Sequence, residues 1–320
     1  MQSKHFLFPS GIIQFLMILL LFSAAGVSAQ SMFRKALDFD GDGRADYAIT
    51  RNQNGSMIWY IWQSSAGLKV VHWGVQYDTP AAGDYDGDGK TDLAVYRETL
   101  GSNPAITYTF HILQSQTGSY VTTSFTDNLY NFNAPLHQDY DGDGKTDPSA
   151  YYGEFGFSLL PMRIRLSATN STASLTVPHQ YAAYRIGDID GDHRAEVAFA
   201  SSGTLQLSNY DSSNPRTVDI STLNGVLIPA DFDGDGKGEL AVWRDSDGTW
   251  LWIRSSDGVM QSVHWGLSGD SPVPADYDGD GKTDLAIWRP GAQSYYWIYG
   301  SQNGLSIIAW GVSGDRTVRY

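Results

Sequence analysis

A nine-residue acidic motif occurs six times in the sequence. Each copy carries Asp at positions 1, 3 and 5, Gly at position 4, and Asp or Glu at position 9. The copies begin at Asp38, Asp84, Asp139, Asp188, Asp231 and Asp276. A unit that recurs at intervals of roughly 40 to 50 residues is typical of a propeller blade. The motif therefore restricts the chain to a repeat architecture, and residues 30–320 are expected to form a single domain of this kind.

The residues between two motifs contain the same short apolar runs in each regular unit. In the last unit these are residues 285–289, 295–298 and 309–311, and residues 272–275 lead into the motif. Short runs separated by turns that contain Gly predict β-strands, and no stretch has the length of an amphipathic helix. We therefore predict an all-β protein, a β-propeller of six four-stranded blades, with seven blades as the alternative.

Two aspects of this architecture stay open at the level of sequence. Residues 315–320 align with the run that begins at Asp270, while residues 33–37 precede the first motif. Either segment could supply the innermost strand of the first blade and so close the ring. A linear solenoid is the competing architecture, but it would need capping units, and the first and last motifs are as regular as the others.

The spacing of the carboxylates within the motif predicts a calcium loop. Oxygen atoms from positions 1, 3, 5 and 9 can converge on a hard cation, because the glycines permit a tight turn. Position 7 is basic in every copy and would contribute only its backbone carbonyl oxygen. Oxygen ligands favour calcium over zinc, and we expect up to six ions. The predicted ligands are Asp38, Asp40, Asp42, Arg44, Asp46, Asp84, Asp86, Asp88, Lys90, Asp92, Asp139, Asp141, Asp143, Lys145, Asp147, Asp188, Asp190, Asp192, Arg194, Glu196, Asp231, Asp233, Asp235, Lys237, Glu239, Asp276, Asp278, Asp280, Lys282 and Asp284.

The simplest alternative is that the motif only forms Asx turns at strand ends, without a metal ion. Repulsion between the carboxylates favours calcium binding over this alternative. The six motifs contain four acidic residues each, or 24 of the 35 in the chain. Clusters of this kind repel one another or take up protons unless a cation neutralises them. Six divalent ions would bring the strongly negative chain close to neutrality. Calcium is therefore expected to stabilise the fold.

The six predicted sites are not equivalent. In the fourth motif His193 replaces the Gly of position 6, and Glu196 replaces the Asp of position 9. Histidine enters the left-handed region of backbone conformation at some cost. This site is therefore predicted to be the weakest and to lose calcium first. The fifth motif, with Glu239 at position 9, is predicted to be intermediate.

The motif followed by Leu-Ala-Val, as in residues 84–95, resembles the FG-GAP or VCBS-type repeat. This is the repeat of integrin α-chain propellers and of many bacterial secreted proteins, and the resemblance covers residues 31–320. It implies calcium in the loop between the first and second strands of each blade. The Phe-Gly and Gly-Ala-Pro signatures of the integrin version are poorly kept, so the bacterial branch is the closer likeness. The family serves adhesion, carbohydrate or protein binding, and enzymes, so the fold alone does not fix the function.

The first residues predict export. An apolar run at residues 11–22 follows Lys4, and small residues precede a cleavage point after Ala29. The run is shorter than the roughly 20 residues that span a bilayer. Residues 1–29 are therefore predicted to be a signal peptide rather than a membrane anchor. We expect the mature protein to be secreted, on the cell surface or in the periplasm, with no insertion into the membrane.

Composition excludes several classes of function. The chain has no Cys, which excludes disulfides, thiol catalysis and thiolate metal sites. Its net charge of −14, which becomes −15 without the signal peptide and its single lysine, argues against nucleic acid as a partner. The sequence has no nucleophile elbow, phosphate-binding loop or His-Glu-x-x-His motif. We therefore expect a monomeric, non-catalytic interaction or adhesion module for a glycan or an extracellular protein.

Two alternatives remain open: a lectin with an aromatic sugar-binding face, and a calcium-dependent polysaccharide lyase or hydrolase. Aromatic residues that recur in the units are expected in blade cores, namely Trp73, Trp243, Trp265, Trp288 and Trp310. The recurring His72 and His264 are likewise expected to be packed. Candidates for a ligand face are the aromatic residues that do not recur, namely Tyr130, Phe132, Tyr151, Tyr152, Phe155 and Tyr210. An enzyme would place its chemistry near His111, His137 and His179.

Overall fold

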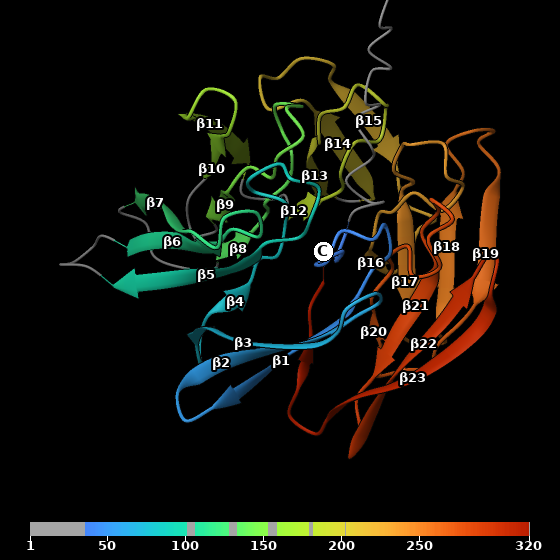
Figure 1. The fold of residues 1–320 in the computed structure, drawn as a ribbon. Coiled ribbons are helices and arrows are strands. Elements are labelled where there is room, and N and C mark those ends of the chain that lie inside the picture. Colours follow the sequence, from blue (N-terminus) through green and yellow to red (C-terminus); the bar gives the residue numbers. More distant parts are fainter. Residues whose placement is uncertain are drawn as a thin grey trace, which may run out of the picture.

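The computed structural model describes residues 36–100, 106–127, 133–152, 159–178, 182–201 and 203–319. These residues form six antiparallel sheets of four strands each, arranged around a common centre (Figure 1). The short first strand of each sheet lies nearest this centre, and the following strands lie progressively farther out (Figure 1). The prediction of a six-bladed propeller is confirmed. The alternatives of seven blades and of a linear solenoid were wrong.

The blades follow the order of the sequence, with one exception in blade 1. That blade consists of β24 (Arg316–Thr317), β1 (Tyr47–Gln53), β2 (Ser56–Gln63) and β3 (Gly67–Val75). Blade 2 consists of β4 (Thr79–Pro80), β5 (Leu93–Leu100), β6 (Ile106–Leu113) and β7 (Tyr120–Asp127), and blade 3 of β8 (Asn133–Pro135), β9 (Ser149–Tyr152), β10 (Leu159–Leu166) and β11 (Ser171–Pro178). Blade 4 consists of β12 (Ala182–Arg185), β13 (Val197–Ser201), β14 (Thr204–Ser208) and β15 (Arg216–Asp219), and blade 5 of β16 (Val226–Leu227), β17 (Ala241–Arg244), β18 (Thr249–Ile253) and β19 (Met260–His264). Blade 6 consists of β20 (Ser271–Pro272), β21 (Leu285–Arg289), β22 (Gln293–Gly300) and β23 (Gly304–Val312).

The C-terminal segment closes the ring. Strand β24 pairs with β1, where Thr317 lies opposite Ile49, and the Val318 amide donates a hydrogen bond to the Ala48 carbonyl. A bidentate ion pair fixes the start of this segment, because both carboxylate oxygens of Asp315 accept hydrogen bonds from Arg51. Of the two segments left open by the sequence, the one that begins at Asp315 therefore provides the innermost strand of blade 1.

Period-two patterning places the cores between the blades. Along β6 the residues Ile106, Tyr108, Phe110 and Ile112 are buried, and the residues between them are only partly buried. This alternation follows from the pleat of a β-strand, which directs successive side chains to opposite faces. Among the described residues, the core cluster with the most buried residues joins blades 1 and 6 across the point where the ring closes. Trp243 and Trp288 are buried, as predicted.

The signal-peptide prediction lies outside the described residues. Within the described part of the chain, no helix has the length and apolarity that a membrane span requires.

Candidate metal sites

The six acidic motifs form six similar loops, called loops 1 to 6 below, between the first and second strands of the blades. In each loop the position-1 carboxylate accepts backbone hydrogen bonds from positions 4 and 6. In loop 1, Asp38 accepts the amide of Gly41 at 2.6 Å and that of Gly43 at 2.9 Å. Both glycines have φ angles above +80°. Glycine adopts this left-handed backbone without strain, so the loop can curl around its first carboxylate.

The position-9 carboxylate joins the two ends of each loop. In loop 1, Asp46 accepts the amide of Phe39 at 2.9 Å and, with its other oxygen, the amide of Ser64 at 2.7 Å. Ser64 lies just beyond β2, and its hydroxyl also donates to Asp42. The outer hairpin of the blade is thereby tied to the loop. Asp46 is buried, and its burial raises the pKa of its carboxyl to about 7.

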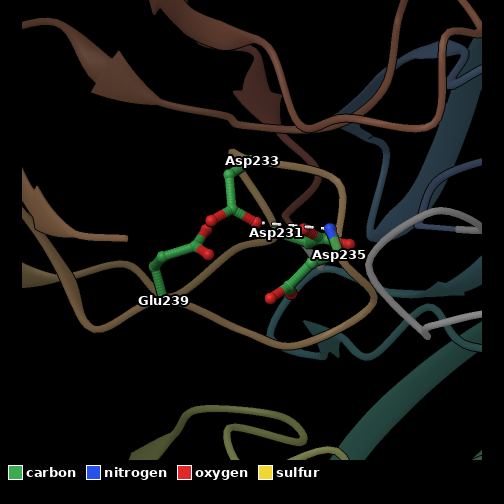
Figure 2. A group of neighbouring side chains, drawn as sticks. All are labelled: Asp231, Asp233, Asp235 and Glu239. Carbon is green, nitrogen blue, oxygen red and sulfur yellow. Dashed lines mark hydrogen bonds between the residues drawn. The ribbon is translucent and has the colours of Figure 1, made fainter. Parts of the chain in front are cut away.

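Loop 5 shows how the carboxylates converge. Figure 2 shows Asp233 and Glu239 pointing toward one another, with Asp231 and Asp235 on the opposite side of the group. One oxygen from each of these four residues lies within 4.8 Å of the others. Similar groups form at Asp38, Asp84, Asp139 and Asp188, each with two further acidic residues of its own loop. The structure therefore brings together all four predicted carboxylates in loop 5 and three of the four in each of loops 1 to 4.

Buried oxygens without partners indicate that these groups fit a cation. Within the described part of the chain, Asp284 Oδ1 in loop 6 and Asp141 Oδ1 in loop 3 are buried and accept no hydrogen bond. An unsatisfied buried carboxylate oxygen costs free energy. Burial also raises the pKa of both Asp284 and Asp147 to about 7, so the carboxylates need a cation or a proton. Hard oxygen ligands of this number suit calcium.

The loops are joined to one another in a closed ring. The position-8 amide of each loop donates a hydrogen bond to the position-1 carbonyl oxygen of the preceding loop. The six bonds run from Thr91 to Asp38, Thr146 to Asp84, Ala195 to Asp139, Gly238 to Asp188, Thr283 to Asp231 and Ala45 to Asp276, at 2.6 to 2.7 Å. The last of these bonds joins loop 1 to loop 6.

The basic residue at position 7 also contacts the preceding loop. The stem of Lys90 covers Gly41, where a Cβ atom would lie 2.8 Å from the Lys90 Cε atom. The same arrangement recurs around the ring, and Arg44 covers Gly279 of loop 6. Sequence reasoning missed this contact, although the basic residue at position 7 of all six motifs was a signal for it. The position-4 glycine is therefore needed both for its φ angle and for the space above it.

Loop 4 differs from the other five. His193 has a φ angle of +70°, as its place at the glycine position requires. The guanidinium of Arg216, the first residue of β15, pairs with Glu196 and lies 3.1 Å from Asp190. Asn209 donates a hydrogen bond to Asp192 at 3.0 Å. A protein cation thus already contacts two of the four predicted carboxylates, so the donor set of this loop does not fit a metal ion as those of the other loops do.

Aromatic pairs join the outer parts of neighbouring blades. Trp62 contacts Trp310 between blades 1 and 6, Trp73 contacts Tyr120 between blades 1 and 2, and Trp265 contacts Tyr299 between blades 5 and 6. Ring centroids are 5.4 to 5.6 Å apart. In each pair the recurring tryptophan is half-buried, whereas Trp62, Tyr120 and Tyr299 are exposed by 46%, 58% and 51%. We call these three contacts the rim pairs.

The rim pairs correct part of the sequence interpretation. Trp73, Trp265 and Trp310 do pack against the blade cores, but each also supports an exposed ring that sequence reasoning overlooked. Tyr151 and Tyr210, predicted as ligand-face residues, instead pack against the core of blades 3 and 4. Tyr130, Phe132, Phe155 and the side chain of Tyr152 lie outside the described residues.

The histidines do not form a common site. His72 and His264 are exposed rather than packed, because the strand alternation buries their neighbours instead. His111 hydrogen-bonds Tyr120 at 2.6 Å on the outer side of β6. His137 lies on the opposite side of the same sheet, where its ring contacts Phe110. His179 lies outside the described residues.

Comparisons with solved structures give matches at low identity. The chain is similar to a lectin of Aleuria aurantia solved with α-methyl-L-fucoside (10% identity, 89% of this chain and 98% of that chain, TM-score 0.44). It is also similar to an uncharacterized protein of Listeria monocytogenes (11%, 89% and 83%, TM-score 0.46) and to a protein of Lactobacillus plantarum (11%, 84% and 82%, TM-score 0.42). No curated protein sequence matches the chain.

A family model matches two parts of the chain. The FG-GAP-like repeat model matches residues 38–95 and 231–287, which contain loops 1, 2, 5 and 6 with the strands that follow them. Loops 3 and 4, in the less regular units, lie outside both matches. The resemblance seen in the sequence and the six blades of the structure agree with this match. The chain thus carries FG-GAP-like repeats at residues 38–95 and 231–287 and folds as a six-bladed β-propeller, which is consistent with an FG-GAP repeat propeller.

Proposed function

We propose that this protein is an exported, non-catalytic binding propeller in which calcium holds the loops and the outer rim binds a glycan. Calcium is supported by the convergent carboxylates of the loops and by their buried, unpartnered oxygens. The predicted ligands are the side chains of positions 1, 3, 5 and 9 with the carbonyl oxygen of position 7. The protein acts outside the cytoplasm as a monomer.

Five of the loops bind calcium, and loop 4 is the exception. There Arg216 supplies a positive charge from within the chain, in contact with Glu196 and Asp190. This arrangement agrees with the prediction that loop 4 is the weakest site. Titration of the metal-free protein with calcium should give a stoichiometry close to five. A stoichiometry of zero would contradict calcium binding altogether.

The rim pairs carry the proposal of a glycan ligand. Sugar rings stack on exposed aromatic faces, and an aromatic side chain that is already held by a neighbour loses little conformational freedom on binding. Trp62, Tyr120 and Tyr299 meet both conditions, because each is about half exposed and contacts a half-buried tryptophan. An extracellular protein that presents glycans would bind to the same surface.

A glycan array tests this proposal directly. The protein is applied with calcium and with a chelator, alongside the variants Trp62→Ala and Tyr299→Ala. Tyr77→Ala is the matched control, because Tyr77 is 88% exposed and belongs to no rim pair. We expect the rim variants to lose glycan signal and the control to keep it. Capture of proteins without any glycan signal would favour the protein ligand, and turnover of a polysaccharide would overturn the non-catalytic assignment.

A further inference from the structure

In blades 1 and 6 the exposed ring of the rim pair stands at the same place of the third strand. The residue directly after the acidic motif pairs with this place, as Tyr47 does with Trp62 and Leu285 with Tyr299. In blade 4 the equivalent residue of the third strand is Ser208, which pairs with the residue after the fourth motif. Blade 4 therefore has a small hydroxyl side chain where blades 1 and 6 have an aromatic ring.

The tryptophan of the rim pair is also missing from blade 3. In blade 1 this tryptophan is Trp73, which lies two residues after Val71 on the outermost strand. The pairing within each sheet makes Leu175 of β11 the equivalent of Val71. The place of Trp73 is therefore taken by Val177. The contact between blades 3 and 4 thus lacks both rings of a rim pair.

A cavity of about 750 Å³ lies at this contact. It is lined by Leu175 and Thr176 from β11 of blade 3 and by Ser208 and residues of β13 and β15 from blade 4. Replacement of two large rings by small side chains accounts for the space. A volume of this size is typical of sites that bind small molecules.

One part of the cavity lining is aromatic. Phe199 and Tyr210 both line the cavity, and both pack against the core that joins blades 3 and 4. Each is only partly buried, so part of its surface is left for a ligand. An aromatic ring held by its neighbours offers a flat apolar face to a sugar ring and loses little conformational freedom on binding.

Hydroxyl groups line the rest of the cavity. The side chains of Thr176, Ser208, Ser212 and Thr217 line it, and within the described part of the chain their hydroxyls form no hydrogen bonds. Each of these hydroxyls can both donate and accept a hydrogen bond. They therefore match a ligand that itself carries many hydroxyl groups.

The charged groups of the cavity already have partners. Arg216 contacts Glu196 and Asp190 of loop 4. Asp211 lies 3.6 Å from Arg194. Because both charges are compensated within the chain, an ionised ligand would lose its hydration without gaining a free counter-charge. The cavity therefore favours an uncharged ligand.

The turn between β14 and β15 is held in a strained conformation beside the cavity. Ser212 and Asn214 have φ angles of +64° and +55°, in a region that few residues other than glycine adopt. Hydrogen bonds fix the turn, from the Ser212 amide to the Asn209 carbonyl and from the Ser213 amide to the Asp211 carboxylate, both at 2.9 Å. Strain of this kind persists where the surroundings fix it, often at binding sites. This side of the cavity is therefore preorganised.

We propose that the cavity between blades 3 and 4 binds a neutral saccharide. A sugar ring lies against Tyr210 and Phe199, and the hydroxyls of the cavity replace the water around the sugar. This site is distinct from the rim pairs, which belong to blades 1, 2, 5 and 6. It extends the glycan binding proposed for the rim to a second place and does not depend on it.

Calorimetric titration of the calcium-loaded protein tests the proposal. The probes are the neutral disaccharides lactose, maltose and cellobiose, with glucuronate as the charged comparison. We expect at least one disaccharide to bind and glucuronate not to bind. Ser208→Trp restores the ring that blade 1 has at this place and fills the cavity, so it should weaken binding at least about tenfold. Ser246→Trp is the matched control, because Ser246 is exposed in the turn between β17 and β18 of blade 5 and should leave the affinity within about twofold.

A second variant keeps the test independent of how Ser208→Trp folds. Tyr210→Leu keeps an apolar contact with the core and removes the aromatic face, so it should also weaken binding at least about tenfold. Thermal unfolding of each variant shows whether it is folded. The proposal is overturned if no disaccharide binds to the wild type, or if the folded variants bind as the wild type does.

The double variant Trp62→Ala/Tyr299→Ala separates this site from the rim. It should keep disaccharide binding at the cavity. Loss of binding in this double variant, with full binding in Ser208→Trp, would place the saccharide at the rim and overturn the present proposal alone. Full binding in the double variant, with loss in Ser208→Trp, would support the cavity even where the rim binds no glycan.

Discussion

Removal of Arg216 should convert loop 4 into a calcium site. In the variant Arg216→Met the apolar stem is kept and the guanidinium is lost, so that Glu196 and Asp190 lose their cation. The side chain of Glu196 is fully buried in the protein, and that of Arg216 is 31% exposed. Breaking a buried ion pair from one side costs about 3 to 5 kcal/mol. Because Arg216 is partly exposed, we expect about 3 kcal/mol, at the lower end of this range.

Calcium should compensate for this loss in the variant. An ion present at a hundredfold excess over its dissociation constant stabilises the folded state by about 2.7 kcal/mol. The difference in unfolding free energy between wild type and Arg216→Met should therefore be about 3 kcal/mol in chelator and close to zero in saturating calcium. The calcium stoichiometry should rise by one.

Urea unfolding followed by tryptophan fluorescence measures the first quantity, and calorimetric titration with calcium measures the second. Arg254→Met is the matched control, because Arg254 forms an exposed ion pair with Asp257 after β18 in blade 5 and contacts no carboxylate of loop 4 in the ion pairs described. Its effect should be below about 1 kcal/mol with or without calcium. An unchanged stoichiometry together with equal destabilisation in chelator and in calcium would refute the reasoning.

Three further predictions follow from the same geometry. In chelator, the stability of the protein should fall as the pH rises from about 4 to about 7. Burial raises the pKa of position-9 carboxyls such as Asp46 from 3.8 to about 7, so in this range the folded state holds protons that the unfolded chain releases. Thermal unfolding across this range checks the sign, and a rising midpoint would contradict it. Gly248→Ala should destabilise the protein by at least about 3 kcal/mol, because the new Cβ would lie 2.2 Å from the carbonyl oxygen of Gly266. Gly258 has a similar φ angle but open space around it, so Gly258→Ala should cost only about 1 to 2 kcal/mol. Equal losses would show that only the backbone angle matters. In the same urea unfolding assay, Asp315→Ala should cost about 3 kcal/mol, because it frees the strand that closes the ring. Asp257→Ala breaks an exposed ion pair and should cost less than about 1 kcal/mol. Similar values for the two variants would argue against closure by residues 315–319.

The architecture could be predicted from the sequence because its signals are local and repeated. Each motif with its four runs specifies one blade, and six copies at blade spacing specify the ring. The choice of closing segment could not be predicted in this way. It depends on the pairing of Thr317 with Ile49 and on the ion pair between Asp315 and Arg51, and both contacts join the two ends of the chain.

The exposed histidines show a limit of reasoning from recurrence. His72 and His264 recur because their strands recur, and recurrence alone predicts packing. A recurring residue on an outer strand has an equal chance of facing solvent, since side chains alternate between the two faces. In β19 and just after it, the burial pattern places Val263 and Trp265 inward, which leaves His264 outward.

The candidate sites were predictable as single loops but not as a ring. Motif spacing shows which carboxylates of one loop converge, because positions 1 to 9 fold locally. It does not show that Lys90 covers Gly41 or that Thr91 bonds Asp38, since these contacts join residues from different blades. Both contacts are made by residues at positions 7 and 8, which lie between the carboxylates of positions 5 and 9. The backbone of each loop is therefore held partly by its neighbours, and a cation that orders one loop also orders the carbonyl and the glycine on which the next loop rests.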